Sequence, residues 1–140
     1  MSARPLLLLG VLAAAPAPRG TLVVEVVGLH SDRGEILVDV HDRPEAFPTK
    51  PREAARRVSA PIAHGRASVA LDGLPYGTYA VAVVHDENGN HELDTNFLGI
   101  PREGVGASND ARGSFGPPKF RDAKFVLASP RQVVTVTMHY

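Results

Sequence analysis

Short runs in which apolar and polar residues alternate are the feature that most constrains the fold of this chain. Because successive side chains of a strand point to opposite faces, a period of two predicts strands with one buried face. The clearest runs are Leu22, Val24 and Val26; Ile36, Val38 and Val40; Ala67, Val69 and Leu71; Tyr79, Val81 and Val83; Phe125 and Leu127; and Val134, Val136 and Met138.

A weaker run covers residues 57–62, and Pro61 within it predicts a strand at the edge of a sheet. No long amphipathic helix interrupts these runs, although residues 43–55 predict one or two short helical turns. The turn residues 31–34 (SDRG) predict a hairpin between the first two strands. The sequence therefore predicts an all-β fold, a seven-stranded antiparallel β-sandwich with a short helical turn.

Composition narrows the class of protein. The 140 residues include 44% hydrophobic and 21% charged residues, which indicates one soluble globular domain. The 15 basic residues equal the 15 acidic residues, so no net field attracts nucleic acid or an anionic membrane. Cysteine is absent, which excludes disulfides, thiolate metal sites, cysteine nucleophiles and a lipid-modified cysteine.

The N-terminus predicts export. Arg4 precedes an apolar run at residues 6–15, which is too short to span a bilayer but has the size of a signal-peptide core. We expect residues 1–20 to be a signal peptide, cleaved between about residues 13 and 20. Residues 21–140 then form the single domain, periplasmic or secreted, with no membrane span. A short apolar strand or helix of a cytoplasmic protein is the alternative.

A long segment rich in Asn, Gly and Pro runs from Asp86 to about Asp122 without a periodic pattern. Connections of this length are uncommon in compact domains and usually either bind something or are disordered. Its beginning, HDENGNHELD at residues 85–94, places short oxygen-bearing side chains at alternate positions.

That spacing is typical of a calcium loop, in which alternate residues supply oxygen ligands. The candidate ligands, at the first, third, fifth, seventh and ninth places, are Asp86, Asn88, Asn90, the carbonyl of Glu92, and Asp94. Glycine is missing at the sixth place, and Phe97 stands where a bidentate glutamate belongs. The alternative is a tight turn at Asn88-Gly89 whose aspartates accept local backbone N–H groups. A calcium site here would be weak, about 10⁻⁴ to 10⁻³ M, and would order the loop.

Two strands end in His-Asp, at His41 and at His85, and imidazole with carboxylate suits zinc or copper. In an antiparallel sandwich these two histidines lie at opposite edges, and the pleat turns only His85 toward the core. We therefore expect His85 to bond a loop carbonyl at the rim of the core and His41 to be solvated.

Other polar groups of the long segment favour structural roles. Ser108 lacks the second glycine of a nucleophile elbow and a strand-to-helix setting, so we expect it to make loop hydrogen bonds. Residues 104–109 likewise lack the third glycine of a dinucleotide loop. Four charged residues are expected to form ion pairs that fasten the loop, with contact to an anionic or sugar ligand as the alternative: Arg102, Glu103, Asp110 and Arg112.

LPYGTY at residues 74–79, followed by alternating valines, resembles the signature of transthyretin-like sandwich modules such as carboxypeptidase regulatory domains. The whole span 21–140 resembles an exported bacterial family, domain of unknown function 2141. The matching motifs are LPYGTY, HDENGN at 85–90, LDTNFLGIP at 93–101, and Ser108-Asn109 leading to GPP at 116–118. His91 stands where such proteins typically carry glycine, and Val105 and Ala107 stand where aromatic residues are common.

The resemblance implies a transthyretin/Ig-like sandwich and export, and it implies no established activity. We expect a non-enzymatic exported module of the bacterial envelope, braced by calcium, that binds an envelope ligand or protein or has a structural role. The alternative is an extracytoplasmic enzyme or a transition-metal carrier that uses His85, Asp86 and Asp94 together.

Overall fold

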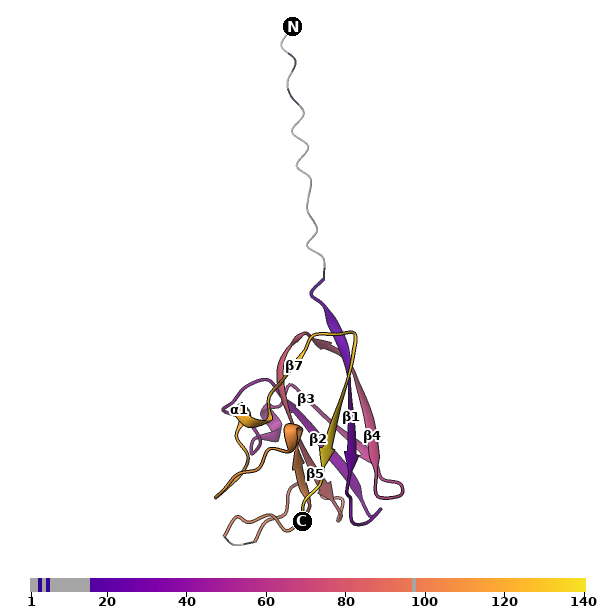
Figure 1. The fold of residues 1–140 in the computed structure, drawn as a ribbon, viewed down its shortest axis with the longest axis vertical. Helices are drawn as coiled ribbons and strands as arrows, with labels where there is room; N and C mark the ends of the chain where they lie inside the picture. Colours follow the sequence, from indigo (N-terminus) through magenta and orange to yellow (C-terminus); the bar gives the residue numbers. More distant parts are fainter. Residues whose placement is uncertain (1–2, 4, 6–15, 97) are drawn as a thin grey trace.

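The computed structural model describes residues 3, 5, 16–96 and 98–140, and it contains two β-sheets that enclose a common core (Figure 1). The first sheet has the order β4-β1-β8 and the second the order β3-β2-β5-β6, with β7 also paired to β5. The strand bounds are β1 Arg19–Val27, β2 Glu35–His41, β3 Arg56–Pro61, β4 Ala67–Pro75, β5 Gly77–Asp86, β6 Val105–Ala107, β7 Phe125–Leu127 and β8 Arg131–Thr137.

The all-β sandwich is therefore confirmed, with eight strands among the described residues in place of the seven predicted. Most of the predicted signal peptide, residues 1–20, lies outside the described residues, and β1 begins at Arg19. Within the described part of the chain, no helix has the length and apolar character needed to cross a membrane.

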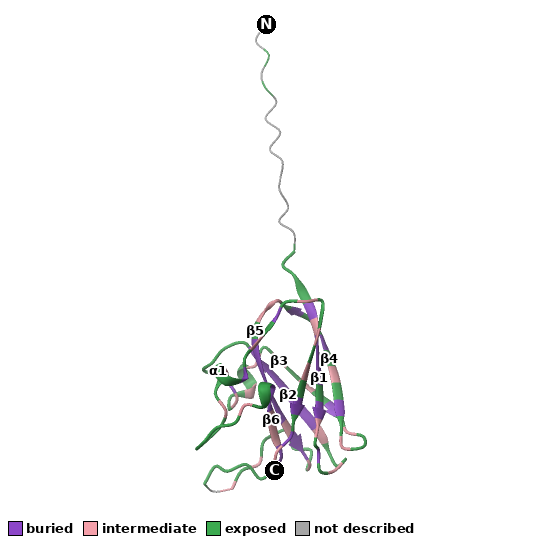
Figure 2. Cartoon of the chain, in the orientation of Figure 1, coloured by how far each residue is buried: buried purple, intermediate pink, exposed green. Residues whose placement is uncertain are grey.

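The alternating apolar residues form the main core, as the sequence predicts. Val24, Val38 and Val81 are fully buried between the two sheets, and Val136 of β8 is fully buried in the same core. Burying a side chain of this size contributes about 1.5–3 kcal/mol, so these strand faces supply most of the favourable free energy of folding. In Figure 2 the buried residues follow the strands, while the loops at the two ends of the sandwich are largely exposed.

The predicted hairpin between the first two strands is wrong, because β1 and β2 lie in different sheets. β1 pairs antiparallel with β4 and parallel with β8, whereas β2 pairs antiparallel with β3 and β5. The connection between β1 and β2 crosses from one sheet to the other. At its end Gly34, with φ of 70°, lies so close to β5 that a Cβ would be 2.0 Å from the Asp86 carbonyl oxygen.

Two further differences concern strand direction and the long segment. The parallel pairing of β1 with β8 departs from the predicted all-antiparallel sandwich, because alternation reports which face is buried and not which way a neighbour runs. The long segment contains β6, a 3-10 turn η2 (Ser108–Asp110) and a short helix α1 (Phe120–Ala123). β6 has only three residues, too few to show a period.

The outer face of the five-stranded sheet is covered by two segments, residues 43–54 and 108–123. The first contains the predicted helical turn, η1 (Pro51–Glu53). The two segments bury a second small core of Phe47, Ala80, Ala82, Ala107 and Ala123. Because this sheet is covered on both faces, polar residues of β2 that a one-sided sheet would expose to water become buried.

Candidate functional site

One end of the sandwich gathers the polar residues that the sequence singles out. The loop that follows β5, residues 87–104, is called the end loop here, and it lies beside the C-terminus (Figure 1). The connection between β1 and β2 reaches the same end, because Glu35 pairs with Asp86 in the sheet and Arg33 contacts His85.

Asp86 closes the first turn of the end loop from inside the protein. Its side chain is fully buried, and its two carboxylate oxygens accept the backbone N–H groups of Asn90 at 3.2 Å and His91 at 2.8 Å. His91 adopts a left-handed backbone with φ of 61°, a conformation that histidine tolerates better than most residues. Asp86 therefore fixes the tight turn that the sequence suggested as the alternative to a calcium site.

Three of the five predicted calcium ligands lie together. The side-chain amides of Asn88 and Asn90 donate to the two carboxylate oxygens of Asp94, at 2.5 and 2.8 Å. The amide oxygens of the same asparagines accept the backbone N–H groups of Asn90 and Glu92. Asp86 is turned toward the backbone instead, and Glu92 lies exposed on the loop.

Glu103 fastens the far end of the end loop. It is 8% exposed, and its two carboxylate oxygens accept the backbone N–H groups of Glu87 at 2.9 Å and Asp94 at 3.0 Å. The sequence predicts a fastening role for this residue through ion pairs, whereas the structure gives it backbone hydrogen bonds. Nothing in a sequence period marks such a contact, because the partners lie nine and sixteen residues away.

Asp110 and Arg112 fasten a different part of the chain. Asp110 Oδ1 lies 2.6 Å from His139 Nε2, and Arg112 also contacts the His139 ring. The hydrogen bond from His139 holds the pKa of Asp110 below its usual range. These contacts tie η2 and the residues directly after it to the segment that follows β8, and His139 is a partner that the sequence did not identify.

A small cavity of about 460 Å³ opens beside the end loop. Both acidic and basic side chains line it, together with amide and hydroxyl groups: Arg33, Glu87, Asn88, Asp94, Thr95, Arg102 and Glu103. A cavity of this character suits a small polar ligand better than an apolar one.

His85 is fully buried at the rim of the core, as the sequence predicts. Its Nε2 lies 2.7 Å from the carbonyl oxygen of Arg33 and its Nδ1 lies 2.6 Å from the hydroxyl of Tyr140. A carbonyl oxygen only accepts hydrogen bonds, so Nε2 carries the hydrogen and the lone pair of the neutral ring is on Nδ1. No signal in the sequence marks the contact between His85 and Tyr140, because 55 residues separate the two.

The three residues of the alternative metal or catalytic site are not brought together. Asp86 follows His85 directly, so the two side chains point to opposite faces of β5. Among the described residues, Asp86 groups with Glu35 and His91, and His85 groups with His30 and Glu87. Asp94 belongs to neither group.

Ser108 makes structural hydrogen bonds, as predicted. Its hydroxyl is buried, donates to the carbonyl oxygen of Ala123 at 2.6 Å, and accepts the backbone N–H of Val81 at 2.9 Å. Both functions of the hydroxyl are used, so it is not poised as a nucleophile.

The sequence matches the family described as "uncharacterized protein conserved in bacteria (DUF2141)" over residues 24–135. The chain belongs to this family. The matched region includes most of the two sheets and the whole end loop. Comparison with curated proteins and with solved structures found no match.

In this DUF2141 member, the two histidines of the His-Asp pairs lie at opposite ends of the β2–β5 ladder, where His41 is paired with Ala80 and Ile36 with His85. The prediction that His41 is solvated is wrong. It is fully buried under Phe47, and neither ring nitrogen has a hydrogen-bond partner among the residues that the structure describes. Burial lowers the pKa of His41, so its ring favours the neutral form.

Asp39 lies two residues before His41 on the same buried face. Burial raises the pKa of Asp39 to about 6, although the Arg57 guanidinium opposes this effect from 3.1 Å. Buried polar groups of this kind arise because residues 43–54 cover a face that the alternation predicts to be solvated.

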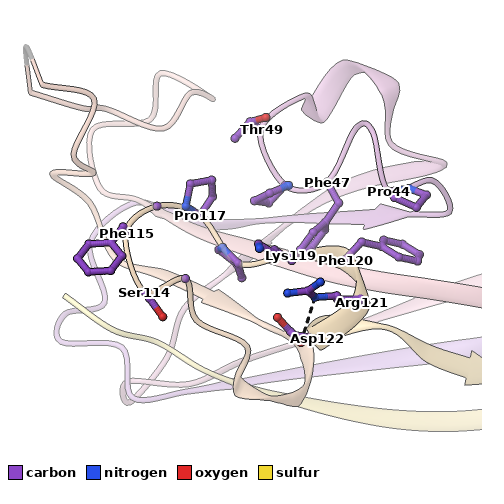
Figure 3. A pocket seen from close by; sticks show the side chains of 14 residues that line it. Pro44, Phe47, Thr49, Ser114, Phe115, Pro117, Lys119, Phe120, Arg121 and Asp122 are labelled. Atoms are coloured by element: carbon purple, nitrogen blue, oxygen red, sulfur yellow. Dashed lines mark ion pairs between the residues drawn. The ribbon is translucent and has the colours of Figure 1, made fainter.

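A second cavity of about 760 Å³ lies between the two covering segments (Figure 3). Phe47 and Phe120 form its floor, with ring centroids 6.0 Å apart, and Pro44 and Pro117 flank it. Phe115, in the stretch GSFGPP at residues 113–118, is fully exposed. This cavity lies on the outer face of the five-stranded sheet and shares no lining residue with the end-loop cavity.

Proposed function

We propose that this protein is an exported, non-enzymatic binding module of the bacterial envelope that presents the end loop as its recognition surface. The observation that carries this proposal is the anchoring of an exposed loop by two buried carboxylates, Asp86 and Glu103. A loop that is ordered before binding loses less conformational entropy when it meets a ligand, so anchoring of this kind favours recognition.

Calcium binding to the end loop is the second part of the proposal. Its support is the convergence of the Asn88, Asn90 and Asp94 side chains within hydrogen-bonding distance of one another. An ion at this place requires the two amides to turn their oxygens inward. Asp86 must share its carboxylate oxygens between the ion and the two backbone N–H groups that they accept, and the Glu92 carbonyl completes the five ligands. The ion would replace the two amide groups that donate hydrogen bonds to the Asp94 carboxylate.

The non-enzymatic part of the proposal is supported by the use of the reactive groups in structural contacts. Ser108 and His85 each have both hydrogen-bonding positions occupied by protein groups. Export is supported by the apolar residues 6–15 after Arg4. Fusing residues 1–20 to a reporter that is active only outside the cytoplasm tests export, and an inactive reporter contradicts it.

Calcium binding is tested by thermal unfolding of the full chain in chelated buffer and in 5 mM Ca²⁺. With a dissociation constant of about 0.5 mM, ligand linkage predicts about 1.4 kcal/mol of stabilisation. For a domain of this size, that is a rise in Tm of about 4 °C. D94N should abolish the rise, whereas D122N, which alters an exposed aspartate on α1, should retain it. An unchanged Tm in the wild type, or an unchanged rise in D94N, contradicts the calcium site.

A further inference from the structure

We propose that His30, His85 and Glu87 form a binding site for a divalent transition-metal ion, Zn²⁺ or Cu²⁺, at the rim of the sandwich. The site shares none of the five predicted calcium ligands, and it does not depend on the proposed role of the end loop. Three elements supply it: β5 ends beside His85, the end loop begins with Glu87, and the connection between β1 and β2 carries His30.

The ligand atoms are spaced for a single ion. His30 Nε2 lies 2.5 Å and His85 Nδ1 lies 3.8 Å from Glu87 Oε1, and all three atoms lie within 4.8 Å of one another. In a tetrahedral site with bonds of about 2.0–2.1 Å, ligand atoms are about 3.3 Å apart. The required shifts are small, and the His30 side chain, which is 49% exposed, can make them by sliding along the face of the Tyr140 ring on which it stacks.

The buried histidine is already oriented as a metal ligand. Because Nε2 of His85 donates to the Arg33 carbonyl at 2.7 Å, the lone pair of the neutral ring lies on Nδ1, the atom that faces Glu87. Histidine ligands almost always donate their other ring N–H to a carbonyl or carboxylate, which fixes the tautomer and the ring orientation. The hydrogen bond from His85 to the Arg33 carbonyl is therefore present before an ion binds, whereas two solvent-exposed histidines would have no such contact to orient them.

Tyr140 completes the surroundings of the site. Its ring stacks on His30 with centroids 3.7 Å apart and planes inclined by 17°, which limits the positions of that imidazole. Its hydroxyl donates to Nδ1 of His85 at 2.6 Å, so it occupies the lone pair that the ion would use. Metal binding therefore displaces this hydrogen bond and leaves the phenol beside the ion.

The donor set selects the class of metal. Two imidazole nitrogens and one carboxylate suit Zn²⁺ and Cu²⁺, whereas Ca²⁺ prefers six to eight oxygen atoms. Three protein ligands leave a fourth position open, as in sites where zinc carries a water molecule. The second group, Glu35, Asp86 and His91, has one imidazole in place of two, so it is a weaker candidate for these metals.

The test is calorimetric titration of the untagged full chain with ZnSO₄ and, separately, with CuSO₄. One ion per chain is expected, and H30Q and E87Q should each weaken binding by at least tenfold. H64N and H91N are matched controls, because both change an exposed histidine with a left-handed backbone, with φ of 55° and 61°, that asparagine tolerates. Both controls should bind as the wild type does. Circular dichroism and Tm verify that each variant is folded.

The variant Y140F tests whether the ion takes the place of the Tyr140 hydroxyl at Nδ1 of His85. Phenylalanine keeps the stacking on His30 but removes the competing hydroxyl, so binding should be equal or several-fold tighter. In the Cu²⁺ form, electron paramagnetic resonance should show two nitrogen ligands in the wild type and one in H30Q. Absence of wild-type binding, unchanged affinity in H30Q, or loss of affinity in H91N or Y140F would overturn the proposed site. The calcium response of Tm is a separate measurement, so failure of one proposal is distinguishable from failure of the other.

Discussion

Glu103 Oε1 accepts the backbone N–H of Asp94 at 3.0 Å, and this bond joins the two halves of the end loop. The other oxygen of the same buried carboxylate accepts the N–H of Glu87 at 2.9 Å. Hydrogen bonds to a charged group contribute about 1.5–3 kcal/mol each, and their loss leaves two N–H groups without a partner. We predict that E103A lowers the free energy of unfolding by about 2–4 kcal/mol, as measured by urea denaturation.

The same variant should release the end loop selectively. Amide hydrogen exchange at Glu87 and Asp94 should become faster in E103A, while exchange in the centre of β2 stays slow. E103Q is the matched control, since its single amide oxygen replaces only one of the two acceptors and should give an intermediate loss. Equal stability of E103A and the wild type would show that the anchoring does not order the loop.

Asp39 makes stability depend on pH in an unusual direction. Burial raises its pKa from the ordinary 3.8 to about 6, so between these two pH values the folded state binds a proton that the unfolded state has released. The contribution of this group to stability is greatest below about pH 4 and is lost as the pH rises toward 6. One pKa unit corresponds to about 1.4 kcal/mol, so the loss is about 3 kcal/mol. In urea denaturation, the free energy of unfolding of the wild type relative to D39N should fall by about this amount between pH 4 and pH 7.

His41 acts in the opposite direction. Burial lowers the pKa of His41, so the unfolded state binds the proton first and stability is lost as the pH falls below about 6.5. H41L has a similar volume and no polar atoms, and it should lose this pH dependence and match or exceed the wild type at pH 7. Denaturation at pH 5 and pH 7 checks the prediction. If the free energy of unfolding of H41L depends on pH as it does in the wild type, another titratable group causes that dependence.

The contrast between His41 and His85 shows how far the sequence alone predicts this molecule. The period of two correctly identified both faces of β2 and β5, and with them the position of His85 at the core rim. It did not predict that residues 43–54 cover the other face, because their composition is typical of any exposed loop. The side-chain period therefore located His41 on the correct face, but it did not predict its burial.

Contacts between segments that are far apart in the sequence could not be predicted either, because a side-chain period does not say which segments pack against each other. Three of the five proposed calcium ligands are close in space because they are close in sequence. His30 and Tyr140 reach His85 from 55 residues away on either side, and only the topology of the two sheets brings them together. A family match adds no contact of this kind, since it extends over residues 24–135 and stops before Tyr140.

Ser108 connects the outer covering segments to the central strand, and this gives the last prediction. β6 pairs with residues 82–84 of β5 and β7 with residues 77–79, so the backbone N–H of Val81 lies between the two pairings. The Ser108 hydroxyl accepts that N–H and donates to the carbonyl oxygen of Ala123 in α1. S108A leaves both buried backbone groups without this partner and should lower the free energy of unfolding by about 1–3 kcal/mol. S114A, an exposed serine in the same long segment, should change it by less than about 0.5 kcal/mol. If urea denaturation shows the two variants to be equally stable, the hydroxyl does not hold α1 against β5.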